Sequence, residues 1–463
     1  MSVKYDHSKE IVPKKLIIPF ALVTLCFALW GAANNMTDLL ITVFKQVKGF
    51  SALEASLIQT AFYGAYFFAP IAAAFIISKL SYKSGAVIGL LLYACGPFLC
   101  YPASQMDSFT FFLCAFYVFA GGCAIVETSV APFVLSMGPR ETATQRINLA
   151  QAFNPVGSIS GILLGKYVIL SNLTPAAEMS QLAGSAKTVA QAHDLSFVVK
   201  AYAIVGVIGL IVGIVILIKK FPNIDSEEEH VPIGGAIKRL AKNKNYLSAV
   251  VAQFFYVGAQ IGVWTFVVDY IKSANIGFNE SSEAWWFYFG SIVAFLLARF
   301  ICAALMKFFD PARLLSTFSV FACIFTVGVI FAPPMIGAVC IILVSACMSL
   351  MFPTIYSLGL LSTGDDKKIG GSGIIMAIVG GAILVPMQGF MNDGKLPSGD
   401  FILNVILRNL FTPMKQALDY LNFEYSTAHS YLMPLICFIV VAIYGFIAHK
   451  KEETSGIIHE LNE

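Results

Sequence analysis

Two carboxylic side chains, Asp38 and Glu127, lie well inside long apolar runs of the sequence. A carboxylate near the centre of a bilayer costs about 2.5–3.5 kcal/mol on insertion scales, so such residues usually face a cavity and serve a function. A carboxyl group taken out of water also accepts a proton more readily. We therefore expect Asp38 and Glu127 to carry protons, although a buried carboxylate that only ties helices together is an alternative.

Polar and aromatic side chains accompany these carboxylates at helical spacing. Trp30, Asn34 and Asp38 are spaced i, i+4, i+8 and share one face of a helix, with Asn35 beside them. Amides and carboxylates can bind the hydroxyl groups of a sugar, and flat aromatic rings can cover its C–H faces. Taken singly, such residues also occur as interfacial aromatics or as interhelical hydrogen bonds. The joint set favours a sugar-binding cavity, with further members Gln59, Tyr63, Tyr66, Gln151, Asn154, Tyr256, Gln260 and Trp264.

Long apolar segments must hold these residues. The chain has 463 residues, of which 58% are hydrophobic and 12% charged, whereas soluble domains are about 25% charged. The pattern predicts an all-α membrane protein and not a transmembrane β-barrel, and the net charge of +3 gives no case for nucleic acid. Twelve membrane spans are predicted at 17–44, 53–77, 85–103, 109–137, 147–170, 201–218, 246–271, 285–306, 314–331, 335–361, 371–391 and 430–448.

Positive charge predicts the orientation of these spans. With the N-terminus inside, the inner segments hold 20 of the 30 Lys and Arg residues, so we expect both termini in the cytoplasm. A charged stretch divides the spans six and six. We expect an N-terminal six-helix bundle over 1-220, a cytoplasmic linker over 221-245 and a C-terminal six-helix bundle over 246-463. In the last outer loop, 401–421 has the apolar spacing of a surface helix.

The two halves also resemble each other. The runs 131–138 and 352–359 share proline, serine and glycine in register, and each leads into a charged loop and a glycine-rich span. This repeat favours a duplicated fold with a site between the halves, near the bilayer midplane. The spacing of Gly157, Gly161 and Gly165 predicts a close-packing helix face.

Sequence signals for an enzyme are missing. We find no nucleotide-binding loop, no nucleophile elbow and no metal-ligand spacing. We therefore expect a secondary transporter that is not an enzyme and that has no cofactor, with the proton as its coupling ion.

A set of specific motifs runs across most of the spans: Trp30-x3-Asn34-Asn35-x2-Asp38, Leu57-Ile58-Gln59-x-Ala61-Phe62-Tyr63, Glu127-Thr128, Asn148-Leu149-Ala150-Gln151-x-Phe153-Asn154, Tyr256-Val257-Gly258-Ala259-Gln260 and Pro353-Thr354-Ile355. By these motifs the chain resembles the L-fucose–proton symporter family within the major facilitator superfamily. The resemblance implies proton-driven sugar symport by alternating access in the inner membrane. It also implies that Asp38 and Glu127 are the key carboxylates, that Gln151 and Asn154 contact the substrate, and that Trp30, Asn35, Gln260 and Trp264 lie near the cavity.

Three positions depart from the family's pattern, with Ala131 in place of Asn, Pro155 in place of Ser and Phe352 in place of Tyr. We include Phe352 among the substrate-binding residues, because the change there removes a hydroxyl group from the cavity region. L-Fucose is the expected substrate, and glucose, galactose and N-acetylglucosamine are alternatives. A facilitator, a sodium-coupled carrier and a membrane sensor that binds sugar without moving it are further alternatives. The expected partners are the sugar and the lipid bilayer, and we expect a monomer.

Overall fold

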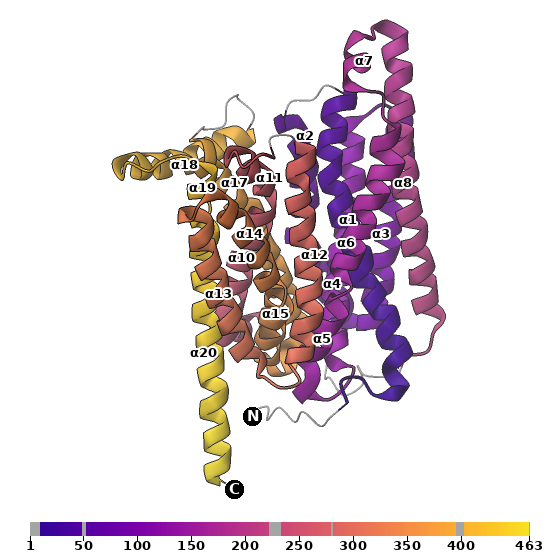
Figure 1. The fold of residues 1–463 in the computed structure, drawn as a ribbon. Coiled ribbons are helices and arrows are strands. Elements are labelled where there is room, and N and C mark those ends of the chain that lie inside the picture. Colours follow the sequence, from indigo (N-terminus) through magenta and orange to yellow (C-terminus); the bar gives the residue numbers. More distant parts are fainter. Residues whose placement is uncertain (1–9, 49–51, 222–232, 279–280, 395–401, 463) are drawn as a thin grey trace. The chain divides into compact units, whose positions relative to one another are not determined.

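The computed structural model describes residues 10–48, 52–221, 233–278, 281–394 and 402–462, though not every side chain in these ranges. Every regular element in these ranges is a helix (Figure 1), which confirms the predicted all-α fold. Among the described residues, twelve segments are long and apolar enough to cross a membrane, as predicted. They are Lys14–Thr37, Ala61–Lys79, Tyr82–Gln105, Phe109–Ser136, Arg140–Asn172, Gly184–Ile218, Lys244–Thr265, Ala284–Leu305, Pro311–Phe331, Pro334–Leu361, Gly364–Asn392 and Thr427–Lys450.

The chain forms two compact units. The N-terminal unit comprises residues 3–247 and 356–377, and the C-terminal unit comprises mainly residues 248–355 and 378–463. A segment from late in the sequence therefore belongs to the N-terminal unit. The division into two six-helix halves joined by a linker stays a prediction. The orientation of the termini also stays a prediction.

Long helices dominate the N-terminal unit. The start of the sixth span differs most from prediction. It was expected at residue 201, but the helix starts at Gly184, in a stretch whose polar residues interrupt the apolar pattern. The helices are α1 (Ile17–Lys48), α2 (Ala52–Lys79), α3 (Tyr82–Gln105), α4 (Phe109–Ser136), α5 (Ala143–Gln151), α6 (Asn154–Leu164), α7 (Ala176–Gln181), α8 (Gly184–Ile218), α9 (Ile233–Lys242) and α16 (Lys367–Met376).

Among the last six spans, the tenth, eleventh and twelfth are each built from more than one helix. The helix predicted at 401–421 is α18, which runs roughly at right angles to the long helices α13 and α20 near their upper ends in Figure 1. The helices of the C-terminal unit are α10 (Lys244–Thr265), α11 (Val267–Ser273), α12 (Ser281–Leu305), α13 (Pro311–Phe331), α14 (Pro334–Met348), α15 (Met351–Leu361), α17 (Gly380–Asp393), α18 (Ile402–Tyr420), α19 (Thr427–Ser430) and α20 (Leu432–Asn462); α10 begins and α15 ends in the N-terminal unit.

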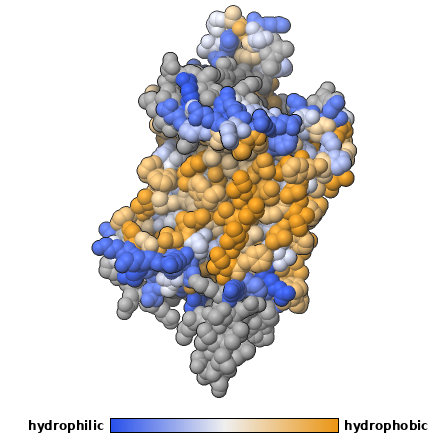
Figure 2. All heavy atoms as spheres, turned by 90° about the vertical axis from the view of Figure 1, so that its left-hand side faces the viewer, coloured by the Kyte–Doolittle hydropathy of each residue, from blue (hydrophilic) through white to orange (hydrophobic). Residues whose placement is uncertain are grey.

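The helix faces that point away from the protein interior carry apolar side chains. Figure 2 shows a broad hydrophobic band between two hydrophilic rims on one face of the molecule. Phe321 and Ile324 on α13 are exposed, as are Ile443 and Phe446 on α20. Exposed apolar side chains in such numbers would be costly in water, whereas the hydrocarbon core of a bilayer accommodates them.

The predicted glycine face of the fifth span packs directly against α1. A Cβ atom built on Gly157 would lie 1.8 Å from the carbonyl oxygen of Ala28, and one on Gly161 would lie 2.5 Å from that of Ala32. Only glycine allows such backbone contact, which confirms close packing at these two positions. A Cβ on Gly380 of α17 would likewise lie 2.0 Å from the carbonyl oxygen of Phe254 on α10. The same kind of helix pair therefore occurs in both halves of the sequence, as a duplicated fold predicts.

Candidate functional site

A break in the fifth span separates the two amides that were predicted to contact the substrate. Helix α5 ends at Gln151 and α6 begins at Asn154, with Pro155 in its first turn. Because proline has no backbone N–H, the carbonyl group of Gln151 lacks the donor that would continue the helix. Discontinuous spans of this kind free backbone polar groups and commonly form the substrate sites of transporters.

The break is fixed against α1. The Asn154 side chain is half-buried, and its Nδ2 atom donates a hydrogen bond to the carbonyl oxygen of Phe27 at 3.3 Å. A Cβ atom on Gly31 would lie 2.1 Å from the carbonyl oxygen of Asn154. The Gln151 side chain is buried. The structure thus brings Asn154 next to the helix that carries the predicted polar stripe.

The stripe on α1 is half-buried at Trp30, Asn34 and Asn35. The Trp30 Nε1–H group donates a hydrogen bond to the hydroxyl of Tyr66 on α2. The Asn35 Nδ2 atom donates back to the carbonyl oxygen of Gly31 at 3.1 Å. Trp30 therefore connects α1 to α2, whereas this contact of Asn35 lies within its own helix.

Three more predicted residues belong to α1 and α2. Tyr63 is half-buried, with its ring edge-on to that of Phe62 at a centroid distance of 5.7 Å. The side chains of Asp38 and Gln59 lie outside the described part of the structure. Their predicted roles therefore rest on their positions in the sequence.

Glu127 lies within α4 and is 3% exposed. Its Oε2 atom has no hydrogen-bond partner in the described part of the chain. The neighbouring Thr128 and Ser129 hydroxyls each donate to a carbonyl oxygen of their own helix at 2.7 Å. A buried carboxylate oxygen without a donor is costly, which suits a group that is charged during only part of a cycle.

Three helices that pack against one another, α1, α2 and α4, carry predicted residues. Tyr66 of α2 binds Trp30 of α1, and Cys123 lies one turn before Glu127 on α4, which packs against α2. We call Trp30, Tyr66, Cys123 and Glu127 the Glu127 cluster. The sequence assigned Trp30 and Tyr66 to the sugar and Glu127 to the proton. The structure brings Trp30 and Tyr66 into contact and places Glu127 in the same unit.

In the C-terminal unit, predicted residues surround a break in the tenth span. Helix α14 ends at Met348 and α15 begins at Met351. The hydroxyl of Tyr256, which is fully buried, donates to the carbonyl oxygen of Met348 at 3.0 Å. The ring of Phe352 lies 6.2 Å from that of Tyr256. Tyr256 therefore satisfies a carbonyl group at the broken helix and holds Phe352 beside it.

A second carbonyl group at the same break is satisfied by Arg299 of α12. Pro353 lacks the N–H that would bind the carbonyl oxygen of Ser349 in a continuous helix, and the Arg299 Nε atom donates to that oxygen at 2.6 Å. The guanidinium also lies 4.5 Å from the centre of the Phe295 ring.

Two other predicted residues lie further along α10. Trp264 is half-buried, and its Nε1–H donates to the hydroxyl of Ser345 on α14 at 3.2 Å. Gln260 is half-buried on the same helix.

The sequence missed two amides of the C-terminal unit. Gln253 on α10 and Gln388 on α17 are fully buried, and neither amide group has a hydrogen-bond partner among the described residues. Gln253 lies three residues before Tyr256 and seven before Gln260, so it would have extended the helix face of these predicted residues by one turn. Gln388 packs against Gly262, which no sequence spacing reveals.

At the loop end that we predict to be cytoplasmic, segments from both halves of the sequence meet inside the N-terminal unit. Arg140 donates to the carbonyl oxygen of Leu361 at 3.1 Å, and the hydroxyls of Thr144 and Ser357 are 2.8 Å apart and buried. Helix α16 packs against both α2 and α4. The start of the fifth span and the end of the tenth are therefore joined at this end.

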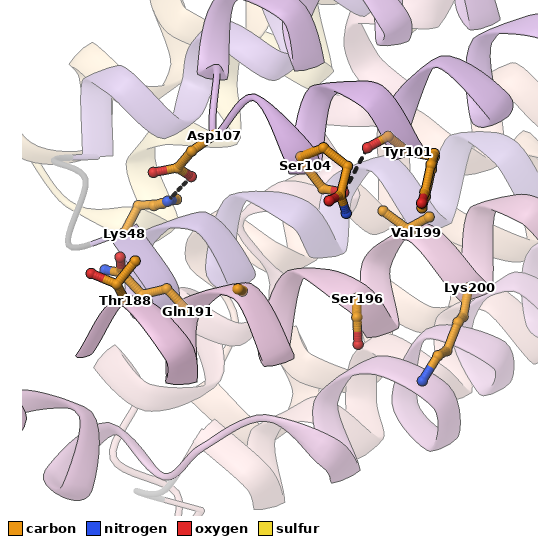
Figure 3. A pocket seen from close by; sticks show the side chains of 11 residues that line it. Lys48, Tyr101, Ser104, Asp107, Thr188, Gln191, Ser196, Val199 and Lys200 are labelled. Atoms are coloured by element: carbon orange, nitrogen blue, oxygen red, sulfur yellow. Dashed lines mark hydrogen bonds and ion pairs between the residues drawn. The ribbon is translucent and has the colours of Figure 1, made fainter. Parts of the chain in front are cut away.

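A cavity of about 380 Å³ lies at the opposite loop end of the N-terminal unit (Figure 3). It is bounded by the ends of α1, α3 and α8, with Lys48 ion-paired to Asp107 and with Ser196 and Lys200 on its α8 side. None of the predicted site residues lines it. This cavity is therefore separate from the Glu127 cluster.

Comparisons with known proteins agree with this architecture. Residues 21–386 match the Major Facilitator Superfamily. The chain is 39% identical to the L-fucose-proton symporter of Haemophilus influenzae, over 95% of this chain and 99% of that protein. It is 36% identical to the L-fucose-proton symporter of Escherichia coli, over 84% and 90% respectively. It is 30% identical to a glucose/galactose transporter of Brucella abortus, over 96% and 97%.

A solved structure supports the same conclusion. FucP, a major facilitator superfamily transporter in the outward conformation, superposes with a TM-score of 0.81 and 32% identity, over 94% of this chain and 99% of that one. The departures at Ala131, Pro155 and Phe352 do not disturb this overall match. The chain therefore belongs to the major facilitator superfamily as a multi-pass membrane transporter, and within it to the family of the L-fucose–proton symporters.

Proposed function

We propose that this protein takes up L-fucose together with protons across the inner membrane, by alternating access. The observation that carries the proposal is Glu127, a buried carboxyl group inside a span, with an oxygen atom that has no partner among the described residues. Greater identity to the two L-fucose-proton symporters than to the glucose/galactose transporter favours L-fucose among the sugars. The protein acts as a monomer, without cofactor or nucleic acid.

The proton sites in this proposal are Glu127 and Asp38. A charged carboxylate is costly when the transporter closes and water is excluded from its interior. Protonation removes that charge. The sugar is bound by the amides and aromatic rings of the broken fifth span and of the first, second, seventh and tenth spans. These residues are Trp30, Asn34, Asn35, Gln59, Tyr63, Gln151, Asn154, Tyr256, Gln260, Trp264 and Phe352.

Hydrogen bonds at the predicted cytoplasmic end connect the fifth and tenth spans. Arg140 and Thr144 near the fifth span hold Leu361 and Ser357 at the end of the tenth. Such contacts would have to break for sugar to leave on that side of the protein.

Uptake by the purified protein is expected to depend on a proton gradient. Proteoliposomes whose outside is more acidic than their inside should accumulate labelled L-fucose. An uncoupler that dissipates this proton gradient should abolish the accumulation. Labelled galactose, glucose and N-acetylglucosamine are tested in parallel. Accumulation driven by sodium alone, or binding of L-fucose without any transport, would refute the proposal.

Phe352→Tyr is expected to change the preference among sugars more than the maximal rate. The added hydroxyl offers one hydrogen bond to the substrate, typically about 1 kcal/mol or about fivefold in affinity. The measurement is competition of galactose, glucose and N-acetylglucosamine against labelled L-fucose. Phe321→Tyr, which adds the same group at an exposed position on α13, is the control. An unchanged ranking in the Phe352 variant would remove this residue from the site.

A further inference from the structure

The cavity drawn in Figure 3 has the size and the lining of a binding site that the proposed sugar transport does not use. Its volume of about 380 Å³ lies in the usual range of ligand pockets, about 300–1,000 Å³. We propose that it binds the phosphate group of an anionic membrane phospholipid with a glycerol headgroup, from the leaflet on the predicted outer side. The proposal is independent of which sugar the protein carries.

Three helices change from apolar to polar at the level of this cavity. On α8, Lys200 is the last charged residue before the apolar run 201–218. The predicted spans on α1 and α3 also end here, within about one turn of the lining residues Lys48 and Ser104. Tyr101, an exposed aromatic residue of α3, lines the cavity as well. The cavity therefore lies where the hydrocarbon core of a bilayer meets its headgroups.

One face of α8 leads from the cavity onto the apolar surface of the protein. Ser196 and Lys200 line the cavity and point to the same side of the helix (Figure 3). Ile204, Val207 and Ile211 follow at i+4, i+7 and i+11 from Lys200, so they continue this face, and all three are exposed. A lipid whose headgroup fills the cavity would therefore lay its acyl chains along apolar side chains.

The lining of the cavity carries an excess of positive charge. Lys48 is ion-paired to Asp107 at one end of the cavity, and Lys200 lies toward the other end (Figure 3). In the described part of the chain, Lys200 has no carboxylate partner, and its ammonium lies 4.5 Å from the centre of the Phe197 ring. Two ammonium groups and one carboxylate leave one positive charge, which matches the single negative charge of a phosphodiester. Lysine is a common ligand of phosphate groups.

Hydroxyl and amide groups of the lining favour a glycerol headgroup. Gln191 donates to the carbonyl oxygen of Val47 at 2.7 Å, and its amide oxygen is an acceptor. The Ser104 and Ser196 hydroxyls can each donate and accept. The headgroup hydroxyls of phosphatidylglycerol can pair with such groups. Phosphatidylethanolamine has the same phosphodiester but adds an ammonium group, which a positively charged lining disfavours.

Lys200→Gln is expected to weaken the binding of phosphatidylglycerol about fivefold, because one lysine near a lipid headgroup contributes about this much affinity. The full-length protein in detergent is titrated with phosphatidylglycerol, and native mass spectrometry counts the bound lipid and gives its apparent Kd. Lys187→Gln is the matched control. Lys187 is an exposed residue of the same helix that does not line the cavity, so this variant should bind the lipid like the wild type.

Asp107→Asn tests the charge argument in the opposite direction. It removes the carboxylate of the lining and so raises the net positive charge of the cavity. Asparagine tolerates the left-handed backbone of this position, where φ is 47°. We expect phosphatidylglycerol to bind at least about twofold more tightly. A gain of affinity cannot arise from misfolding, whereas unchanged or weaker binding would contradict the proposal.

Parallel titrations with phosphatidylethanolamine, glycerol 1-phosphate and inorganic phosphate identify the ligand. We expect phosphatidylglycerol to bind at least about fivefold more tightly than each of these. Equal affinity for the two lipids would overturn the proposed glycerol headgroup. Glycerol 1-phosphate or inorganic phosphate that binds as tightly as phosphatidylglycerol would show a site for a soluble anion and overturn the lipid. Equal losses of affinity in Lys200→Gln and Lys187→Gln would show that the lipid does not bind in this cavity.

Discussion

Glu127→Gln is expected to abolish concentrative uptake of L-fucose while leaving exchange of sugar across the membrane. Glutamine resembles a protonated glutamate in shape but cannot release a proton. Exchange between preloaded vesicles and medium needs no net proton release, so it should continue at no less than about a tenth of the wild-type rate. The measurement pairs active uptake with counterflow in the same proteoliposome preparation.

Asp38→Asn extends this test to the second carboxyl group. It is expected to abolish gradient-driven accumulation while binding of L-fucose survives, because the sugar site is retained and only the charge is lost. Binding is followed by Trp fluorescence. Glu178→Gln, which removes a carboxyl group outside the predicted spans, is the control. Normal accumulation by the Asp38 variant would remove the first span from the coupling mechanism.

Gly157→Ala is expected to have the largest effect on stability. The new Cβ atom would overlap the carbonyl oxygen of Ala28, so α1 and α6 must separate. Overpacking of this kind costs typically about 1–3 kcal/mol, and we expect the melting temperature of the full chain in detergent to fall by about 5 °C.

Gly64→Ala on α2 provides the control for that prediction. A Cβ atom there meets nothing within 4 Å, and alanine is the better helix former by about 0.5–1 kcal/mol. The control should therefore melt at or above the wild-type temperature. Equal melting temperatures for the two variants would contradict the close approach of α1 and α6.

The sequence predicts the spans well because each is a long apolar run, and bilayer thickness sets its length. Breaks within spans are harder to predict. Pro155 and Pro353 are visible in the sequence, but Pro132 lies inside the unbroken helix α4. A proline alone therefore does not show which span is interrupted, since neighbouring side chains such as Arg299 and Tyr256 decide whether the freed carbonyl groups are satisfied.

The candidate site shows the same limit. Helical spacing places Trp30 and Asn34 on one face, and it places Tyr63 and Tyr66 near one another. It cannot show that the indole of Trp30 reaches Tyr66, because that contact depends on how α1 packs against α2. The buried amide of Gln388 escaped notice for the same reason, as its position is set by Gly262 on another helix.

Sugar-induced proton movement tests the central claim most directly. Proteoliposomes containing the full-length protein and an internal pH-sensitive dye are given L-fucose outside, with the membrane potential clamped and no initial pH gradient. We predict acidification of the interior that follows sugar entry, that is lost in Glu127→Gln, and that is absent with a sugar that is not transported. Entry of labelled L-fucose at the normal rate with no change of internal pH would contradict proton-coupled symport.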